Sequence, residues 1–150
     1  VHSADLGALS SLWYDRAAVL AQMGLLRLSA DAEQRWQVCA QSWLDESAVF
    51  FWIALIDALP VAALCVAREV DRDDIPPLRV ARVLDLVVDL HAPQAQQGVV
   101  RALVKALCEQ LKVQGIGELW VEASALLPVE QAFWRGLGAR REAQLLKVIL

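Results

Sequence analysis

Apolar residues recur along the first part of the chain at the spacing of an α-helix. A repeat every three or four positions predicts one helix over residues 3–23 and a second that begins after Ser29 or Asp31, either of which can cap it. The apolar positions of the two helices are Leu6, Leu9, Leu12, Trp13, Ala17, Leu20 and Met23, then Trp36, Cys39, Ala40 and Trp43. Both helices are therefore expected to bury one face.

A nearly uncharged segment follows at residues 48–67, and it has two interpretations. Its length satisfies the rule of about 20 residues for crossing a bilayer, which would make the protein membrane-associated. Against this, Asp57 and Pro60 lie near its centre, and a central Asp opposes membrane insertion by about 2.5–3.5 kcal/mol. The β-branched and aromatic residues at 49–53 favour the other interpretation, two buried antiparallel strands joined by a turn at 57–60.

The second half of the chain predicts strands and helices in alternation. We expect a strand over residues 82–90, a helix from near Gly98 to about Gln114, a strand over 118–123, a helix over 128–135 and a strand over 143–150. The first of these strands would place on one face Leu84, Leu86, Val88 and Leu90, and on the other Val83, Asp85, Val87 and Asp89. Strand, long helix and strand in that order predict a parallel crossover. The expected fold class is α/β (α+β), a single domain over residues 1–150 with a mixed sheet and helices on both faces.

Composition and charge exclude several classes of protein. The 150 residues suffice for one domain, and a hydrophobic content of 57% excludes intrinsic disorder. A formal net charge of −4 argues against a nucleic-acid partner, because such proteins normally carry a basic surplus or stripe. The hydrophobic content leaves a homodimer open.

The cysteine and histidine pattern indicates neither a disulfide framework nor a metal site. Cys39, Cys65 and Cys108 are widely spaced and form no CxxC pair, so we expect small buried hydrophobic residues in a reducing cytoplasm. His2 and His91 are too few for a histidine-rich site, so no metal is expected. No basic segment precedes an apolar stretch, and a signal peptide is therefore not expected.

The turn from the strand at 82–90 into the following helix is the candidate binding site. The first N–H groups of a helix lack acceptors within the helix and carry partial positive charge, which suits a phosphate. Gly98 would let a ligand approach the main chain, and Arg101 would add a charge. The amides concerned are those of Gln96, Gln97, Gly98, Val99, Val100 and Arg101. The alternative is a plain strand–helix turn, because one glycine is weaker than a full glycine fingerprint.

This stretch resembles the acetyl-CoA loop of the GCN5-related N-acetyltransferases (GNAT), whose signature is Gln/Arg-x-x-Gly-x-Gly/Ala after a hydrophobic strand. Gly98 falls on the first glycine, and residues 90–93 resemble the family's Val-x-Pro strand exit. Residues 130–139 resemble a later motif, in which a helix with an aromatic pair ends in Leu-Gly-Phe. The resemblance covers nearly the whole chain and implies a mixed, mostly antiparallel sheet. The family's first strand would precede Val1.

The sequence departs from the family's pattern at four positions. Ala95 replaces the Gln or Arg, Val100 the second Gly or Ala, and Ala139 the Phe after Leu-Gly. Trp134 stands where the family often has a tyrosine that protonates the departing thiolate, a role that an indole N–H does not fill. Trp134, Ala95 and Val100 favour an alternative function, a catalytically degenerate module that binds CoA or a protein partner without turnover.

The resemblance implies transfer of an acetyl group from acetyl-CoA to an amine by direct attack, without a metal. The acceptor would be a small-molecule or peptide amine. Acetyl-CoA would lie along Val88 and Leu90, the amides of the helix start, and Trp134. An amine with a pKa near 10.4 needs a base at neutral pH, and Glu122 is the first candidate, with Asp85 and Asp89 as competitors. The alternative for each carboxylate is an ordinary solvated side chain.

Overall fold

The computed structural model describes residues 2–55, 63–70, 79–89, 98–123 and 127–141. Its elements in chain order are a 3₁₀ helix Ser3–Asp5, α1 Leu6–Gln22, α2 Ala32–Asp45, β1 Val49–Ala54, β2 Ala63–Val70, β3 Val80–Val88, α3 Val99–Val113, β4 Glu118–Trp120 and α4 Pro128–Gly136. This order confirms the elements predicted up to residue 136. The expected turn at 57–60, the loop before Gly98 and the last strand at 143–150 lie outside the described residues.

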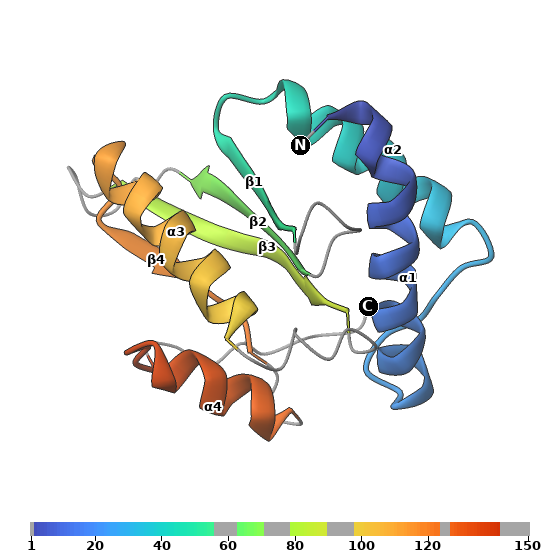
Figure 1. Cartoon of the computed structure of the whole chain (residues 1–150). Helices are drawn as coiled ribbons and strands as arrows, with labels where there is room; N and C mark the ends of the chain where they lie inside the picture. The colour runs from blue at the N-terminus through green and yellow to red at the C-terminus, as the bar shows by residue number, and fades with distance from the viewer. Residues whose placement is uncertain (1, 56–62, 71–78, 90–97, 124–126, 142–150) are drawn as a thin grey trace, which may run out of the picture.

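The strands form one mixed sheet in the order β1-β2-β3-β4 (Figure 1). β1 pairs with β2 and β2 with β3 in antiparallel fashion, whereas β3 pairs with β4 in parallel. Helices α1 and α2 cover one face of the sheet, and α3 and α4 lie on the other (Figure 1). The predicted fold class and the parallel crossover through α3 are confirmed.

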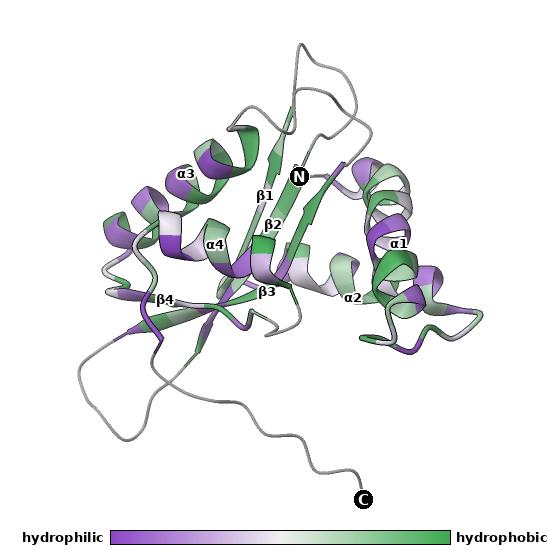
Figure 2. Ribbon diagram, turned by 90° about the horizontal axis from the view of Figure 1, so that it is seen from below, coloured by the Kyte–Doolittle hydropathy of each residue, from purple (hydrophilic) through white to green (hydrophobic). Residues whose placement is uncertain are grey.

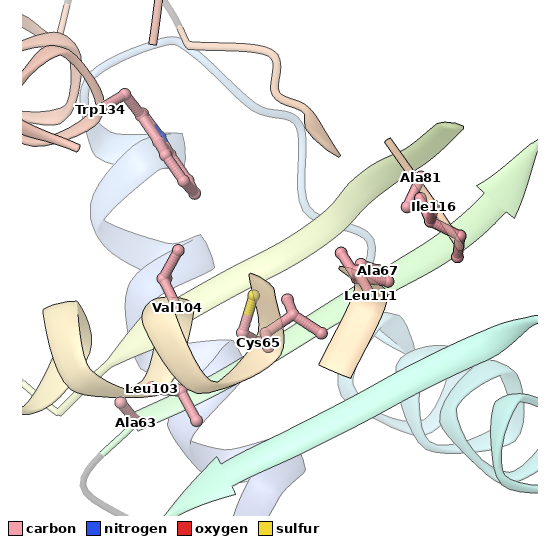
Figure 3. Close-up of a cluster of buried hydrophobic side chains, with 10 residues drawn as sticks. Ala63, Cys65, Ala67, Ala81, Leu103, Val104, Leu111, Ile116 and Trp134 are labelled. Carbon is pink, nitrogen blue, oxygen red and sulfur yellow. The ribbon is translucent and has the colours of Figure 1, made fainter. Parts of the chain in front are cut away.

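β2 is the central strand of two hydrophobic cores. Its residues Ala63 to Ala67 are all fully buried and alternate between the two faces of the sheet. On the α3 side they are Ala63, Cys65 and Ala67, small side chains that let α3 pack close to the sheet through Leu103, Val104, Leu107 and Leu111 (Figure 3). On the other side Leu64 and Val66 pack against Leu9, Trp36 and Ala40 of α1 and α2. Figure 2 shows the hydrophobic colour running along β1 and β2, whereas α3 carries both colours.

The nearly uncharged segment contributes two neighbouring antiparallel strands, residues 49–54 and 63–70. Within the described ranges, no helix is long and apolar enough to cross a membrane.

Three local predictions are wrong. The expected strand at 118–123 ends at Trp120, because residues 121–123 turn away from β3. Asp31 precedes α2 as its N-cap, but its side chain makes no capping hydrogen bond. Cys39 is exposed and Cys108 is only partly buried, and of the three cysteines Cys65 alone is fully buried.

The alternation of faces predicted for residues 82–90 is also wrong, because it does not continue across Leu84. Val66 pairs with Asp85 and Ala67 with Val83, so Leu84 has no partner on β2 and forms a β-bulge. An extra residue resets the alternation of side chains. Val83 therefore packs on the α3 side together with Leu86, although a regular strand would put them on opposite faces.

Candidate functional site

The candidate site is a cleft between β3 and β4. The two strands pair over three residues only, with Val80 to Arg82 beside Glu118 to Trp120. Beyond Arg82, β3 continues to Val88 while the chain after Trp120 leaves the sheet. A cleft of about 460 Å³ opens there, lined by Arg16, Arg82, Val83, Leu84, Asp85, Leu86, Val121, Glu122, Glu130 and Trp134. β4 does not cover this edge of β3, so an extended ligand can lie along it.

The bulge at Leu84 determines which side chains face the cleft from each side. Leu84, Asp85 and Val83 all line the cleft, yet Val83 belongs to the core on the α3 side and Asp85 contacts α2 on the opposite side. Bulges often re-aim side chains next to active sites. The bulge thus places a carboxylate at the opening while keeping the strand's apolar packing.

Asp85 is a largely buried carboxylate held by two helices. Its side chain is 11% exposed, and its Oδ2 accepts a hydrogen bond of 3.1 Å from the indole Nε1–H of Trp36 on α2. Nη1 of Arg16 on α1 lies 3.8 Å from its Oδ1. Burial raises the pKa of Asp85 above that of an ordinary Asp, although the Trp36 hydrogen bond and the Arg16 charge oppose the rise. Asp85 is therefore better suited to take a proton near neutral pH than an exposed carboxylate.

Glu122 also lines the cleft, but it is engaged with a neighbouring cation. Its carboxylate forms an ion pair with Arg82 of β3, and both side chains are about half exposed. Taking a proton would break that ion pair, which makes Glu122 a poorer base as the structure stands. Asp89 follows the end of β3 and is not among the residues that line the cleft.

Arg16 joins two carboxylates from separate elements across the cleft. Its guanidinium lies 3.8 Å from Asp85 and 3.6 Å from Glu130 of α4. Neither Arg16 nor Glu130 was predicted from the sequence as a site residue. The signal for Arg16 was its place beside the buried Ala17 on the apolar side of α1, where an unpaired charge is unfavourable. Three carboxylates and two arginines thus line the cleft, and each carboxylate forms an ion pair with one of the arginines.

Helix α3 begins where the resemblance requires. Gly98 is its N-cap with a φ of 94°, and the first bond of the helix runs from the N–H of Ala102 to the carbonyl of Gly98 at 2.9 Å. The N–H groups of a helix's first turn have no acceptor within the helix. Leu90, Gln96 and Gln97 lie outside the described residues.

The other residues predicted to bind acetyl-CoA are placed as follows. Val100 packs against the core on the α3 side, so its bulk points into the protein. Arg101 donates a hydrogen bond of 2.8 Å from Nη1 to the carbonyl of Gly136, and thus joins α3 to the end of α4. Trp134 is buried, lines the cleft and reaches from α4 towards the sheet (Figure 3). Val88, at the end of β3, pairs with Ala63.

Gly98→Ala is expected to lower the free energy of unfolding by about 1–2 kcal/mol, because an L-residue is strained at this φ although no atom obstructs its Cβ. Gly7→Ala is the matched control. Gly7 lies in α1, its Cβ would also meet nothing, and alanine should stabilise the helix by about 0.5–1 kcal/mol. Urea unfolding of both variants measures the two values. Equal effects would contradict the left-handed backbone at Gly98.

Asp85→Asn is expected to change how stability depends on pH. Because the pKa of Asp85 is raised on folding, its contribution to stability falls as pH rises from the unfolded value of 3.8 through the folded value. Asn removes this fall. The free energy of unfolding of the variant, relative to that of the wild type, should therefore increase as pH rises through that window. Urea unfolding at a series of pH values measures the difference.

Glu69→Gln is the control of opposite sign. A hydrogen bond from Arg79 lowers the pKa of Glu69. The free energy of unfolding of this variant, relative to that of the wild type, should therefore decrease as pH rises. A pH-independent difference between Asp85→Asn and the wild type would show that Asp85 is not buried as a charge.

Comparison with known proteins gives structural matches only. No protein-family model and no curated protein matches the sequence. A tetramutant of a Bacillus halodurans protein has a TM-score of 0.79 at 16% identity, covering 100% of this chain and 97% of that one. An aminoglycoside antibiotic 6'-N-acetyltransferase from Acinetobacter haemolyticus has a TM-score of 0.76 at 16% identity, covering 100% and 94%.

A ribosomal-protein-alanine N-acetyltransferase from Brucella melitensis biovar Abortus 2308 matches with a TM-score of 0.72 at 16% identity, covering 100% of this chain and 95% of that one. At such identities the likeness shows the fold. The parting of β3 and β4, the glycine-capped α3 and the full-length matches agree with one another. The chain therefore has the fold of the GCN5-related N-acetyltransferases, the family that its sequence resembles.

Proposed function

We propose that the protein is an N-acetyltransferase that uses acetyl-CoA to acetylate an amine by direct attack. The observation that carries the proposal is the cleft between β3 and β4, which holds a buried carboxylate with a raised pKa. α3 begins after the end of β3 with a glycine N-cap, so the strand edge and the helix amides belong to consecutive elements.

Acetyl-CoA would contact the edge of β3 and the start of α3. The residues assigned to it are Val88, Leu90, Gln96, Gln97, Gly98, Val99, Val100, Arg101 and Trp134. The packing of Val100 supports this assignment, because the side chain that replaces the family's small residue is partly buried against the core. Arg101 would have to leave the carbonyl of Gly136 to reach a phosphate.

The reaction needs a base for the amine and a proton for the thiolate. The amine nitrogen attacks the thioester carbonyl carbon, a C–N bond forms and the C–S bond breaks. We assign the amine's proton to the carboxylate of Asp85, because it is the more buried of the two cleft carboxylates considered and because this burial raises its pKa. Glu122 and Asp89 are the competing candidates. The departing thiolate would take its proton from water, since Trp134 offers only an indole N–H.

The second candidate function is a CoA-binding module without turnover. Trp134 favours it, because this residue lines the cleft and has no acidic hydroxyl group. The cytoplasmic location and the homodimer stay predictions.

Release of free thiol from acetyl-CoA across a panel of amines tests the proposal. The panel should include aminoglycosides and peptides with N-terminal alanine, because two structural neighbours are named for such acceptors. Thiol release that requires both the amine and acetyl-CoA, with an acetylated product seen by mass spectrometry, is the expected result. Binding of acetyl-CoA without turnover on any amine would favour the module, and absence of binding would refute both functions.

A further inference from the structure

A second hollow of about 410 Å³ lies between the middle of α1, the link that follows this helix, and α2. Its wall contains three tryptophans, Trp13 of α1 and Trp36 and Trp43 of α2. Trp13 and Trp36 are stacked with ring centroids 5.8 Å apart, and Trp43 meets Trp36 edge-on at 6.1 Å. Trp36 is buried, whereas Trp13 and Trp43 are half-buried and therefore still offer ring surface to a ligand.

The outer end of this hollow is positive. Arg27 and Arg35 line it, and both are exposed. Arg35 has an acidic neighbour: the pKa of Asp31 is lowered, mainly by a hydrogen bond from Ser29 and also by the charge of Arg35. Arg27 makes no ion pair or hydrogen bond with any residue in the described part of the chain. An anionic group entering the hollow would therefore meet an uncompensated guanidinium.

The inner end of the hollow is Asp85, the same carboxylate that lines the cleft between β3 and β4. Among the described residues that line the second hollow, Asp85 is the one acidic residue. Its side chain is 11% exposed and lies 3.8 Å from the guanidinium of Arg16, whereas Arg27 and Arg35 are exposed. The hollow thus has a positive rim, an aromatic wall and a negative floor. A ligand that matches all three has an anion at one end of an aromatic ring and an amine at the other.

We propose that this hollow binds a small aromatic molecule that carries an anionic group at the end facing Arg27. This part of the inference rests on the proposed function: the molecule is the acceptor, and its amine at the opposite end lies at Asp85, which lines both cavities. The wall of three tryptophans selects the ring, and Arg27 selects the charge.

Calorimetric titration of the full chain with 4-(aminomethyl)benzoate tests the site without any turnover. Its amide, 4-(aminomethyl)benzamide, keeps the ring and the amine and lacks the anion. The carboxylate is expected to bind about tenfold or more tightly than the amide. Arg27→Glu should remove that preference, and the surface variant Arg140→Glu, with the same change of charge, should keep it. A shift of the Trp36 indole N–H resonance on binding locates the ligand.

Equal affinity for the two compounds, or a preference that survives Arg27→Glu, would overturn the inference. So would the absence of saturable binding by the carboxylate. Titration of the same sample with acetyl-CoA separates the two proposals. If the carboxylate binds in a way that depends on Arg27 and acetyl-CoA does not bind, the site is upheld and the proposed function is overturned. If acetyl-CoA binds and the carboxylate does not, the proposed function is upheld and the site is overturned.

Discussion

Asp85→Asn is expected to lower kcat/KM for acetyl transfer by about 10²–10⁴-fold, the contribution typical of a positioned base. The asparagine oxygen still accepts the hydrogen bond from Trp36, so the side chain should keep its place while losing the ability to take a proton. The raised pKa of Asp85 adds a signature in pH. As pH is lowered, kcat/KM of the wild type should begin to fall at a higher pH than an ordinary Asp would cause. The variant should lack that fall.

Glu122→Gln is the matched control for Asp85→Asn. Both residues line the cleft and both changes replace a carboxylate with an amide. Because Glu122 is paired with Arg82, its loss should lower kcat/KM by less than about tenfold. A larger loss for Glu122→Gln than for Asp85→Asn, or an unchanged pH profile in the latter, would move the base to Glu122.

Trp134→Ala is expected to lower the free energy of unfolding by about 3–5 kcal/mol. The indole is 6% exposed, and it packs with the buried residues of α3 and β2 on one face of the sheet. It also meets the ring of Phe133 edge-on, with centroids 5.2 Å apart. α4 has only nine residues, so losing its one buried side chain should loosen the helix that forms one wall of the cleft. Urea unfolding followed by circular dichroism measures the change.

Val129→Ala on the same helix is the control for Trp134→Ala. Val129 is 85% exposed, so its truncation should change the free energy of unfolding by less than about 0.5 kcal/mol. If Trp134→Ala lowers the free energy of unfolding by as little as Val129→Ala does, α4 does not depend on the packing of Trp134.

The helices and strands follow from local pattern, and they were predictable for that reason. Apolar spacing located α1, α2 and α3, and the glycine at 98 marked the start of α3. β-branched and aromatic residues identified β1. The bulge at Leu84 was not predictable, because it depends on how β3 is matched to β2 and leaves no mark in the alternation of residues.

The site was predictable only in part, because its contacts join distant segments. Glu122 and Trp134 were selected from the sequence and both line the cleft. The environment of Asp85 depends on Trp36 and Arg16, which lie 49 and 69 positions away in the chain, and no periodicity reports such contacts. Arg101 was expected beside a phosphate, but its partner, Gly136, becomes visible only once α3 and α4 are placed.

Titration calorimetry of the full chain with acetyl-CoA tests the central claim that the cleft between β3 and β4, with the start of α3, is a CoA site. The account predicts saturable binding to one site with a Kd below about 1 mM. The absence of any saturable heat up to that concentration, in a sample whose unfolding transition shows that it is folded, would contradict it.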